Sequence, residues 1–350
     1  MTLPEFLYHI GYSIKKTHVL KHQKRLPGPV ISIGNVTVGG TGKTPATIAV
    51  AEEAMKRGFS PIILTRGYRG KAEGPCFVKQ SAVSSQQSDK KNKTNSLLIT
   101  HHSSLLYGDE PVLMAERLKD VPVVKCADRY EGGIFAINSI APSLHHSIIF
   151  ILDDGFQHWR LHRDVDVVLV DGLNPFGNRR ILPVGPLREP LSELKRAGIF
   201  VITKIKNEAL ADELKGINPD APVYFSEYEI HRIRDKEGNE FQAEALRDKK
   251  VYAFCGIANP ESFRQTVLSL SGEMSGFKAF RDHCKYTEAD LMFLERQRKA
   301  LNCDYLITTE KDMVKLRELK APDDVLCIEI GFKVRAAFFE DVFRRIERPA

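Results

Sequence analysis

The sequence predicts an α/β protein built on a doubly wound, mostly parallel β-sheet, with a second, smaller α/β domain. Three observations carry this prediction. Short apolar, β-branched runs alternate with segments of helical spacing from residue 30 to about residue 220, as in sheets whose parallel strands are joined by helices. A glycine-rich turn joins the first of these strands to its helix. The same alternation of strand and helix returns after residue 247.

Length and composition limit the classes of protein to consider. A chain of 350 residues that is 43% hydrophobic exceeds what one core usually supports, so we expect one large or two smaller domains. The six cysteines have neither C-x-x-C nor metal-ligand spacing, which favours reduced thiols in a cytosolic protein. We find no cleavable signal pattern and no apolar run of the ~18 residues that a membrane span needs.

The net charge of +6 is concentrated near the N-terminus, where residues 1–25 contain five Lys or Arg and one acid. Apolar residues recur there at helical spacing, at Leu3, Phe6, Leu7, Ile10 and Ile14. We therefore predict an amphipathic helix with a cationic flank. Such a helix either lies in a membrane interface or packs its apolar face on the body of the protein, and the residues leave both readings open.

Residues 30–53 read as strand, glycine-rich loop and helix, and the rest of the chain is organised around them. Glycines in the core sequence GGTGKT let successive backbone N–H groups surround phosphate oxygens at the positive end of the helix. Lys43 would reach the terminal phosphates, and the Thr44 hydroxyl would hold Mg²⁺. These features indicate a P-loop NTPase-type fold. The alternative, a glycine turn with a chance Gly-Lys-Thr, is disfavoured by the flanking strand and helix.

The predicted phosphate-binding residues are Thr37, Val38, Gly39, Gly40, Thr41, Gly42, Lys43 and Thr44. The full pattern G-x-x-x-x-G-K-[ST] requires a leading glycine, and this chain has threonine at that position.

The next segments supply candidate ligands of lower specificity. A buried strand over 61–65 is followed by Arg66 and Arg69, which would either meet phosphate at the nucleotide crevice or lie in a solvated loop. The polar composition of residues 79–106 predicts a flexible insertion. Asp109 then precedes a helix that we expect from Val112 to Leu118, and acids at that place are also ordinary capping residues.

A second strong signal is the hydrophobic run of residues 147–152, which ends in Asp153 and Asp154. Such a strand aims a carboxylate at the Mg²⁺ of a nucleotide site. Neighbouring side chains of an extended chain point to opposite sides, so one carboxylate would face the metal and the other the loop or the acceptor. The sequence does not decide which.

A long loop over 174–190 contains three arginines (Arg179, Arg180 and Arg188), which suggests an anionic ligand. We divide the chain into an N-terminal helix (1–25), a P-loop kinase domain (26–221), a β-hairpin linker (222–246), a smaller α/β domain (247–330) and a C-terminal strand and helix (331–350) that could pack back on the first domain.

Seven segments together resemble the tetraacyldisaccharide 4′-kinase family, the lipid A kinases. They are VGGTGKTP (38–45), LTRGYRG (64–70), GDEP (108–111), DDGFQH (153–158), the loop at 174–190, DH-x-x-YT (282–287) and TEKD (309–312). They occur in the family's order over most of the chain, and the family's loop also lacks the leading glycine. Cys284 departs from the pattern, because many members have a second histidine there.

The resemblance implies ATP- and Mg²⁺-dependent transfer of the γ-phosphoryl group to the 4′-hydroxyl of a tetraacylated glucosamine disaccharide 1-phosphate. It places the enzyme on the cytoplasmic face of the bacterial inner membrane, with the N-terminal helix in contact with lipid. It also implies that Asp109 is the catalytic base and that His283 of the second domain assists it. No nucleic acid and no protein partner is expected. The remaining predicted site residues are Arg66, Arg129 and Arg188 for phosphate contacts, and Thr44, Asp153 and Asp154 for the metal.

Two other readings compete. A P-loop GTPase or an ATP-driven metal-insertion switch would use hydrolysis without an acceptor, but Val38 replaces the signature lysine of such ATPases. Thr203-Lys204 resembles part of a guanine-reading N-K-x-D motif, yet the aspartate is missing. A nucleic-acid-binding protein is suggested only by the basic charge, which sits on an amphipathic terminus and not over a groove-sized face.

Overall fold

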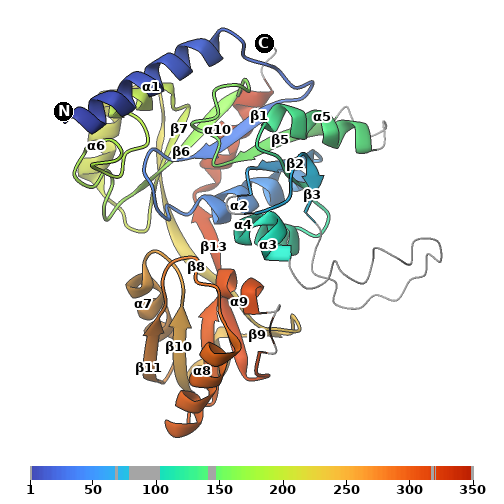
Figure 1. Cartoon of the computed structure of the whole chain (residues 1–350), viewed down its shortest axis with the longest axis vertical. Coiled ribbons are helices and arrows are strands. Elements are labelled where there is room, and N and C mark those ends of the chain that lie inside the picture. The colour runs from blue at the N-terminus through green and yellow to red at the C-terminus, as the bar shows by residue number, and fades with distance from the viewer. Residues whose placement is uncertain are drawn as a thin grey trace.

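The computed structural model describes residues 2–67, 70–78, 103–140, 147–316, 319 and 321–347. Within these residues the chain forms two lobes (Figure 1). Arg69 and most of the predicted insertion, residues 79–102, lie outside the described residues, and the chain resumes in the short helix α3 (Ser103–Tyr107).

The first lobe is an α/β layer structure with a mostly parallel sheet, as predicted. Its strand order is β3-β4-β2-β5-β1-β6-β7, and the edge strand β3 is the antiparallel one. The strands are β1 (Val30–Gly34), β2 (Ser60–Thr65), β3 (Cys76–Phe77), β4 (Val123–Lys125), β5 (Ile148–Asp153), β6 (Val165–Asp171) and β7 (Ile199–Thr203). The helices between them are α2 (Lys43–Lys56), α4 (Asp109–Arg117), α5 (Arg129–Ser139) and α6 (Glu208–Ile217), with a 3₁₀ segment at Leu191–Arg196.

The apolar runs that predicted these strands are buried because helices cover both faces of the sheet. Alternate residues point to opposite faces. Ile31 and Ile151 belong to the core under α2 and α4, whereas Phe150 and Leu152 belong to the core under α5. Central strands buried on both faces hold the carboxyl ends of β1 and β5 in fixed positions.

The second lobe continues the sheet through one shared strand. The first three residues of β8 (Val223–Asp235) pair in parallel with β7, and the rest of β8 pairs antiparallel with β13 (Val325–Val334). Figure 1 shows these two strands running together between the lobes. The lobe also contains β9 (Glu240–Phe241), β10 (Lys250–Cys255), β11 (Glu273–Ala279), β12 (Tyr305–Thr309), α7 (Pro260–Leu270), α8 (Glu288–Ala300), α9 (Glu310–Leu316) and a 3₁₀ turn (Ala243–Leu246).

Two predicted boundaries differ from the structure. The segment 222–246 does contain a hairpin, β8 with β9, but β8 is a member of both sheets and not a separate linker. The boundary between 330 and 331 falls inside β13, because this strand pairs with β8 over its whole length from Leu326 to Val334. The chain then returns to the first lobe, where α10 (Ala336–Ile346) buries Phe338 and Phe343 in the core under β1 and β6.

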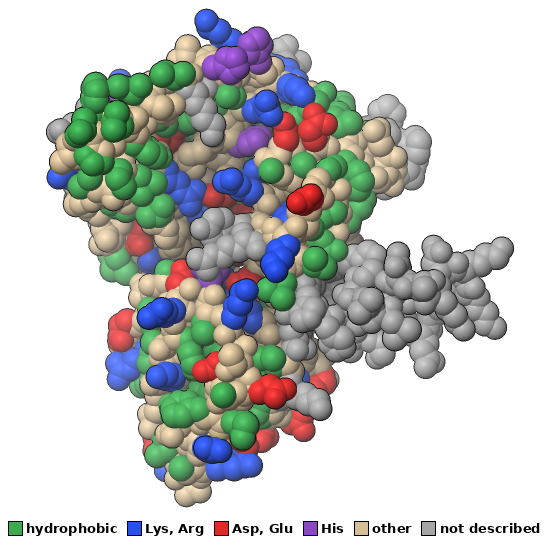
Figure 2. Space-filling model, in the orientation of Figure 1, with side chains coloured by type: hydrophobic (Ala, Val, Ile, Leu, Met, Phe, Trp, Pro, Cys, Tyr) green, Lys and Arg blue, Asp and Glu red, His purple; other side chains and the backbone are tan. Residues whose placement is uncertain are grey.

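Helix α1 (Leu3–Leu20) lies along the first lobe (Figure 1). The apolar side chains that predicted it are exposed. Leu7 is 61% exposed and Ile14 is 66% exposed. Hydrophobic side chains gather at the upper left of Figure 2, where Figure 1 places the first half of this helix. The predicted apolar face therefore does not pack on the body of the protein. In the described part of the chain, no helix is both long enough and apolar enough to cross a bilayer.

Candidate active site

The predicted phosphate loop joins the end of β1 to the start of α2. Gly39 and Gly42 have φ values of 123° and 84°, a conformation that favours glycine. A Cβ added at Gly42 would lie 2.5 Å from the Tyr228 hydroxyl, so the packing of this side chain from β8 also favours glycine. The loop is fixed by a 2.8 Å hydrogen bond from the Val38 amide to the Pro186 carbonyl. It therefore presents the N-terminus of α2 as an anion site.

Lys43 begins α2, and its largely buried side chain points back along the loop. Its Nζ lies 3.3 Å from Asn35 Oδ1 and 3.5 Å from Asp154 Oδ1. Thr44 follows in the first turn. The buried Thr41 hydroxyl has no hydrogen-bond partner in the described part of the protein. The loop thus contains a cation and hydroxyl groups at the positive end of a helix.

The structure separates the roles of the two adjacent aspartates. Asp153 ends β5 and is buried, with Oδ2 accepting a 2.9 Å hydrogen bond from Thr65. Its Oδ1 has no partner among the residues described here. Burial raises the pKa of Asp153 to about 7, and the neighbouring charges of Glu110 and Asp154 add to the effect. An orphaned, buried carboxylate oxygen is a position that a cation would satisfy.

Asp154 follows the strand with a left-handed φ of 52° and has different hydrogen-bond partners from Asp153. Arg188 Nη1 lies 2.8 Å from its Oδ1 and 2.7 Å from its Oδ2. Burial favours protonation, but the charges of Lys43 and Arg188 lower the pKa of Asp154. Asp154 is therefore an ionised group that holds two cations beside the phosphate loop.

The described residues do not form a metal cage made of protein ligands alone. Within the described ranges, no group of three or more His, Cys, Asp or Glu side chains is arranged to hold a metal ion. Mg²⁺ does not need such a cage, since it commonly binds one or two carboxylates and completes its shell with water and phosphate oxygens. Asp153 and the Thr44 hydroxyl fit that requirement.

The predicted catalytic pair meets across the two lobes. Helix α4 begins at Asp109, earlier than the predicted Val112, so the acids of GDEP lie in its first turn. His283 lies in the loop after β11 with a left-handed φ of 56°. Its Nδ1 is 3.3 Å from Asp109 Oδ2, although the two residues are 174 positions apart.

Sequence reasoning missed a third member of this group, Lys315 of α9. Its buried Nζ lies 3.7 Å from Asp109 Oδ2 and 3.0 Å from Asp312 Oδ1. Asp312 is itself fully buried and accepts a 2.9 Å hydrogen bond from the Gly256 amide. The TEKD segment was the available signal, because Asp312 belongs to it and Lys315 follows one turn later. Only the fold places that turn against α4.

Burial and the neighbouring groups have opposite effects on the pKa of Asp109. Burial favours its neutral form, but the hydrogen bond with His283 and the charges of Lys315 and Lys311 outweigh burial and lower the pKa of Asp109. Lys311 Nζ also lies 3.3 Å from Glu110 Oε1. Asp109 is therefore ionised at neutral pH, the state that a proton acceptor requires.

Buried ion pairs hold α4 against the second lobe. Arg117 Nε lies 2.7 Å from Glu310 Oε1 of α9 and 3.4 Å from Glu329 Oε2 of β13. Arg117 Nη2 also donates a 2.9 Å hydrogen bond to the Ile330 carbonyl. Since the Arg117 side chain is only 4% exposed, this contact fixes the helix that carries Asp109.

The predicted arginines lie in different surroundings. Arg188 reaches the site through Asp154, but Arg179 and Arg180 pair with Glu213 and Glu5 away from it. Of the three arginines of this loop, Arg188 is the one placed beside the predicted phosphate site.

Arg129 begins α5 and is buried, with Nη1 donating a 3.0 Å hydrogen bond to the Ala127 carbonyl. Burial lowers the pKa of Arg129, and the charges of Asp153 and Asp154 oppose this shift. Arg66 follows β2 and is exposed.

The chain is similar to one group of known proteins over nearly its whole length. The family model described as tetraacyldisaccharide-1-P 4′-kinase (LpxK) matches residues 2–347. The chain is 37% identical to the tetraacyldisaccharide 4′-kinase of Syntrophus aciditrophicus, covering 90% of this chain and 83% of the relative. It is 38% identical to that of Geobacter metallireducens, covering 84% and 80%. The crystal structure of LpxK from Aquifex aeolicus in complex with ATP is similar with a TM-score of 0.71 and 28% identity, covering 98% and 97% of the two chains.

Proposed function

The chain belongs to the tetraacyldisaccharide 4′-kinase family, and on that premise we propose how its residues carry out the reaction. The protein is an ATP-dependent kinase of lipid A synthesis that phosphorylates the 4′-hydroxyl of a tetraacyldisaccharide 1-phosphate. The resemblance and the activity predicted from the sequence are confirmed, and the switch ATPase and nucleic-acid readings are set aside.

ATP is the phosphoryl donor, and its phosphates bind where β1 passes into α2. The support for this placement is the left-handed conformation of Gly39 and Gly42 in the loop that leads into the N-terminus of α2, where backbone N–H groups favour an anion. Lys43 lies at the same point and would neutralise charge on the transferring group. Thr37, Val38, Gly40 and Thr41 complete the loop.

Mg²⁺ would be held by Asp153 and the Thr44 hydroxyl, together with phosphate oxygens and water. When bound, the ion neutralises charge on the phosphates. Asp154 remains a predicted ligand, but its contacts with Arg188 and Lys43 favour another task. In our proposal it keeps both cations directed at the phosphates, and Asp153 is the principal metal ligand.

Asp109 takes the proton of the sugar 4′-hydroxyl. An ionised carboxylate within hydrogen-bond reach of an acceptor alcohol is a competent general base. His283 orients this carboxylate through the 3.3 Å contact, and Lys315 keeps it ionised. The pair comes from both lobes, so the acceptor would bind between them, and movement about β8 and β13 would open and close the site.

Arginines supply the remaining positive charge. Arg188 is oriented by Asp154 and would contact the nucleotide phosphates. Arg129 carries a buried guanidinium beside Asp153 and Asp154, and Arg66 is exposed at the end of β2. Both would meet phosphate of the nucleotide or of the lipid.

Helix α1 would contact the cytoplasmic surface of the inner membrane. Its exposed apolar side chains and the basic residues that follow suit the acyl boundary and the anionic headgroups of a bilayer. This placement would bring the first lobe to the surface that contains the acylated substrate.

The single observation that carries the proposed mechanism is the meeting of His283 and Lys315 at the carboxylate of Asp109, on the helix whose next residue, Glu110, is close enough to Asp153 to raise its pKa. The test is to incubate the purified protein with Mg·ATP and the lipid disaccharide 1-phosphate and to analyse the lipid by mass spectrometry. We expect a bisphosphorylated product that depends on the lipid, on ATP and on the metal. ATP hydrolysis without a phosphorylated lipid would contradict the proposal.

A further inference from the structure

Two tyrosines on the inner face of α1 contact consecutive residues of the loop that reaches the active site. Tyr8 Oη donates a 2.8 Å hydrogen bond to the Arg188 carbonyl, and Tyr12 Oη donates a 3.2 Å hydrogen bond to Glu189 Oε2. Tyr8 and Tyr12 are four residues apart and so share one face of the helix. Arg188 holds Asp154 on the other side of the same loop. The loop therefore lies between α1 and the nucleotide site.

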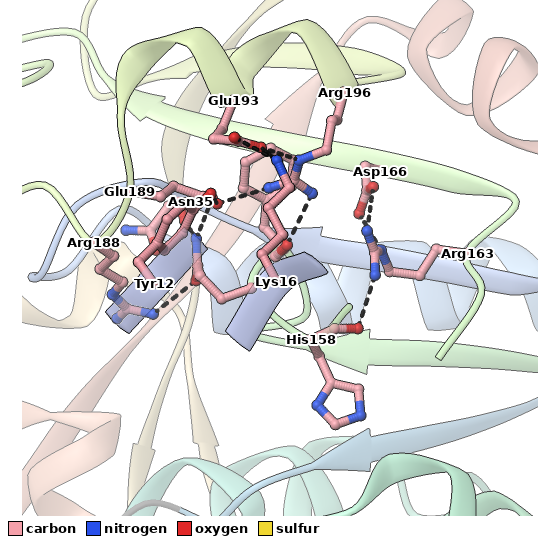
Figure 3. A network of polar contacts seen from close by, with 12 residues as sticks. Tyr12, Lys16, Asn35, His158, Arg163, Asp166, Arg188, Glu189, Glu193 and Arg196 are labelled. Carbon is pink, nitrogen blue, oxygen red and sulfur yellow. Dashed lines mark hydrogen bonds and ion pairs between the residues drawn. The ribbon is translucent and has the colours of Figure 1, made fainter. Parts of the chain in front are cut away.

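Glu189 is the centre of this contact and has no exposed surface. Its Oε1 accepts a 2.7 Å hydrogen bond from Gln157, and its Oε2 accepts one of 2.7 Å from Arg196 as well as that of Tyr12. Figure 3 shows Tyr12 reaching from the helix to Glu189, with Arg196 on the same carboxylate. A buried carboxylate is stable only when its oxygens are paired, so its donors fix its position.

Gln157 continues the chain of contacts to the phosphate loop. Its Nε2 also donates a 2.8 Å hydrogen bond to the Asn35 carbonyl, at the start of that loop. The Asn35 side chain donates to the Thr37 carbonyl at 2.8 Å and accepts from Lys43 Nζ at 3.3 Å. Tyr12 is thus connected to Lys43 through the side chains of Glu189 and Gln157 and then through the backbone and side chain of Asn35.

We propose that Tyr12 is a positioning residue for ATP: acting through Glu189 and Gln157, it holds the phosphate loop and Lys43 in their binding arrangement. The proposal rests on the function proposed above for this site. The inner face of α1 then supports the nucleotide site from outside, because the helix contributes no group that touches ATP. The outer, apolar face of the same helix remains free for another surface.

The test is Tyr12→Phe in the full-length protein, measured by titration with a fluorescent ATP analogue in the absence of lipid. This change removes one hydroxyl and keeps the ring, which packs edge-to-face on Trp159 at 5.0 Å. A hydrogen bond to a charged group supports an effect of up to about tenfold. We expect nucleotide affinity to fall about three- to tenfold and the KM for ATP to rise equally, with the KM for lipid nearly unchanged.

Tyr224→Phe is the matched control. Tyr224 lies in β8, and its hydroxyl is bonded to the carboxylate of Asp341 on α10. The variant therefore also loses a tyrosine–carboxylate hydrogen bond, and it should leave the KM for ATP unchanged. Tyr8→Phe is the second variant, which should weaken ATP binding in the same direction through Arg188. Because Tyr12 acts through Gln157, adding Tyr12→Phe to Gln157→Leu should weaken ATP binding no further.

The outcomes separate this inference from the proposed function. If the wild-type protein fails to bind the analogue, the proposed function is wrong. If the wild type binds the analogue, and Tyr12→Phe and Tyr8→Phe bind it as tightly as the wild type does, the positioning role is wrong and the proposed function stands. If kcat falls and both KM values rise by similar factors, and the melting temperature is lower, then the role of Tyr12 is purely structural and the inference is overturned.

Discussion

The two sides of the active site are built in different ways. On the phosphate side, Lys43 and Thr44 belong to one loop and helix, and Asp153 and Asp154 end one neighbouring strand. On the acceptor side, Asp109 meets His283, which comes from the other lobe. Phosphate is bound by backbone geometry, which a short segment can encode. A proton acceptor needs partners from several directions, and these come from distant parts of the chain.

The largest effect is expected from a substitution that removes the proton acceptor, Asp109. Asp109→Asn keeps the shape of the side chain but cannot accept a proton, so we expect kcat to fall about 10²- to 10⁴-fold. The affinity for a nucleotide analogue should stay the same, because the phosphate side is intact. Single-turnover kinetics with the lipid substrate would measure the loss. A decrease of less than about tenfold would remove Asp109 from the role of general base.

The matching change on the phosphate side is Lys43→Met. It removes a charge that would stabilise the transferring phosphoryl group, and we expect kcat to fall about 10²- to 10³-fold. Here the nucleotide affinity should fall as well, unlike in Asp109→Asn. Steady-state kinetics at saturating lipid would show both effects. A normal KM for ATP in this variant would contradict the assignment of the loop.

Lys315→Met tests the contact that sequence reasoning missed. Lys315 lowers the pKa of Asp109, so its removal raises that pKa and protonates the base at a higher pH. We expect the acid limb of the kcat/KM profile to move to higher pH, so that kcat/KM falls below that of the wild type at acid pH and recovers as the pH rises. The measurement is a pH profile of kcat/KM.

The matched control for that profile is Lys311→Met on the same helix. Lys311 pairs with Glu110 and lowers the pKa of Asp109 less than Lys315 does, so the acid limb of the Lys311 variant should move less. Identical profiles for the Lys315 variant and the wild type would show that Lys315 does not set the ionisation of the base.

The smallest expected effect concerns the outer face of α1. Leu7→Asp removes an exposed apolar side chain and should weaken binding to anionic vesicles about fivefold. A loss of this size is part of the free energy gained when one leucine side chain is buried in the membrane. Sedimentation with vesicles would measure it, and activity on detergent-dispersed substrate should not change. Leu268→Asp on α7 replaces an exposed leucine of the second lobe and should bind vesicles normally. Equal binding by both variants would reject the membrane role of α1.

The central fold was predictable because its signals are local. Buried β-branched runs gave β1, β5 and β6, and the glycine-rich turn placed the phosphate loop between β1 and α2. The double membership of β8 was not predictable. Its residues form one extended run in the sequence, but pairing with β7 at one end and with β13 at the other depends on strands far away in the chain.

The sequence by itself determined the phosphate loop and the acids at the end of β5, because backbone conformation and strand alternation are short-range properties. Only the tertiary structure brought Lys315 against Asp109, turned Asp154 toward Arg188, and connected Tyr12 to the phosphate loop. These contacts join residues separated by tens to hundreds of positions. Their distances follow from the packing of α4 on α9 and of α1 on the loop, which no local pattern encodes.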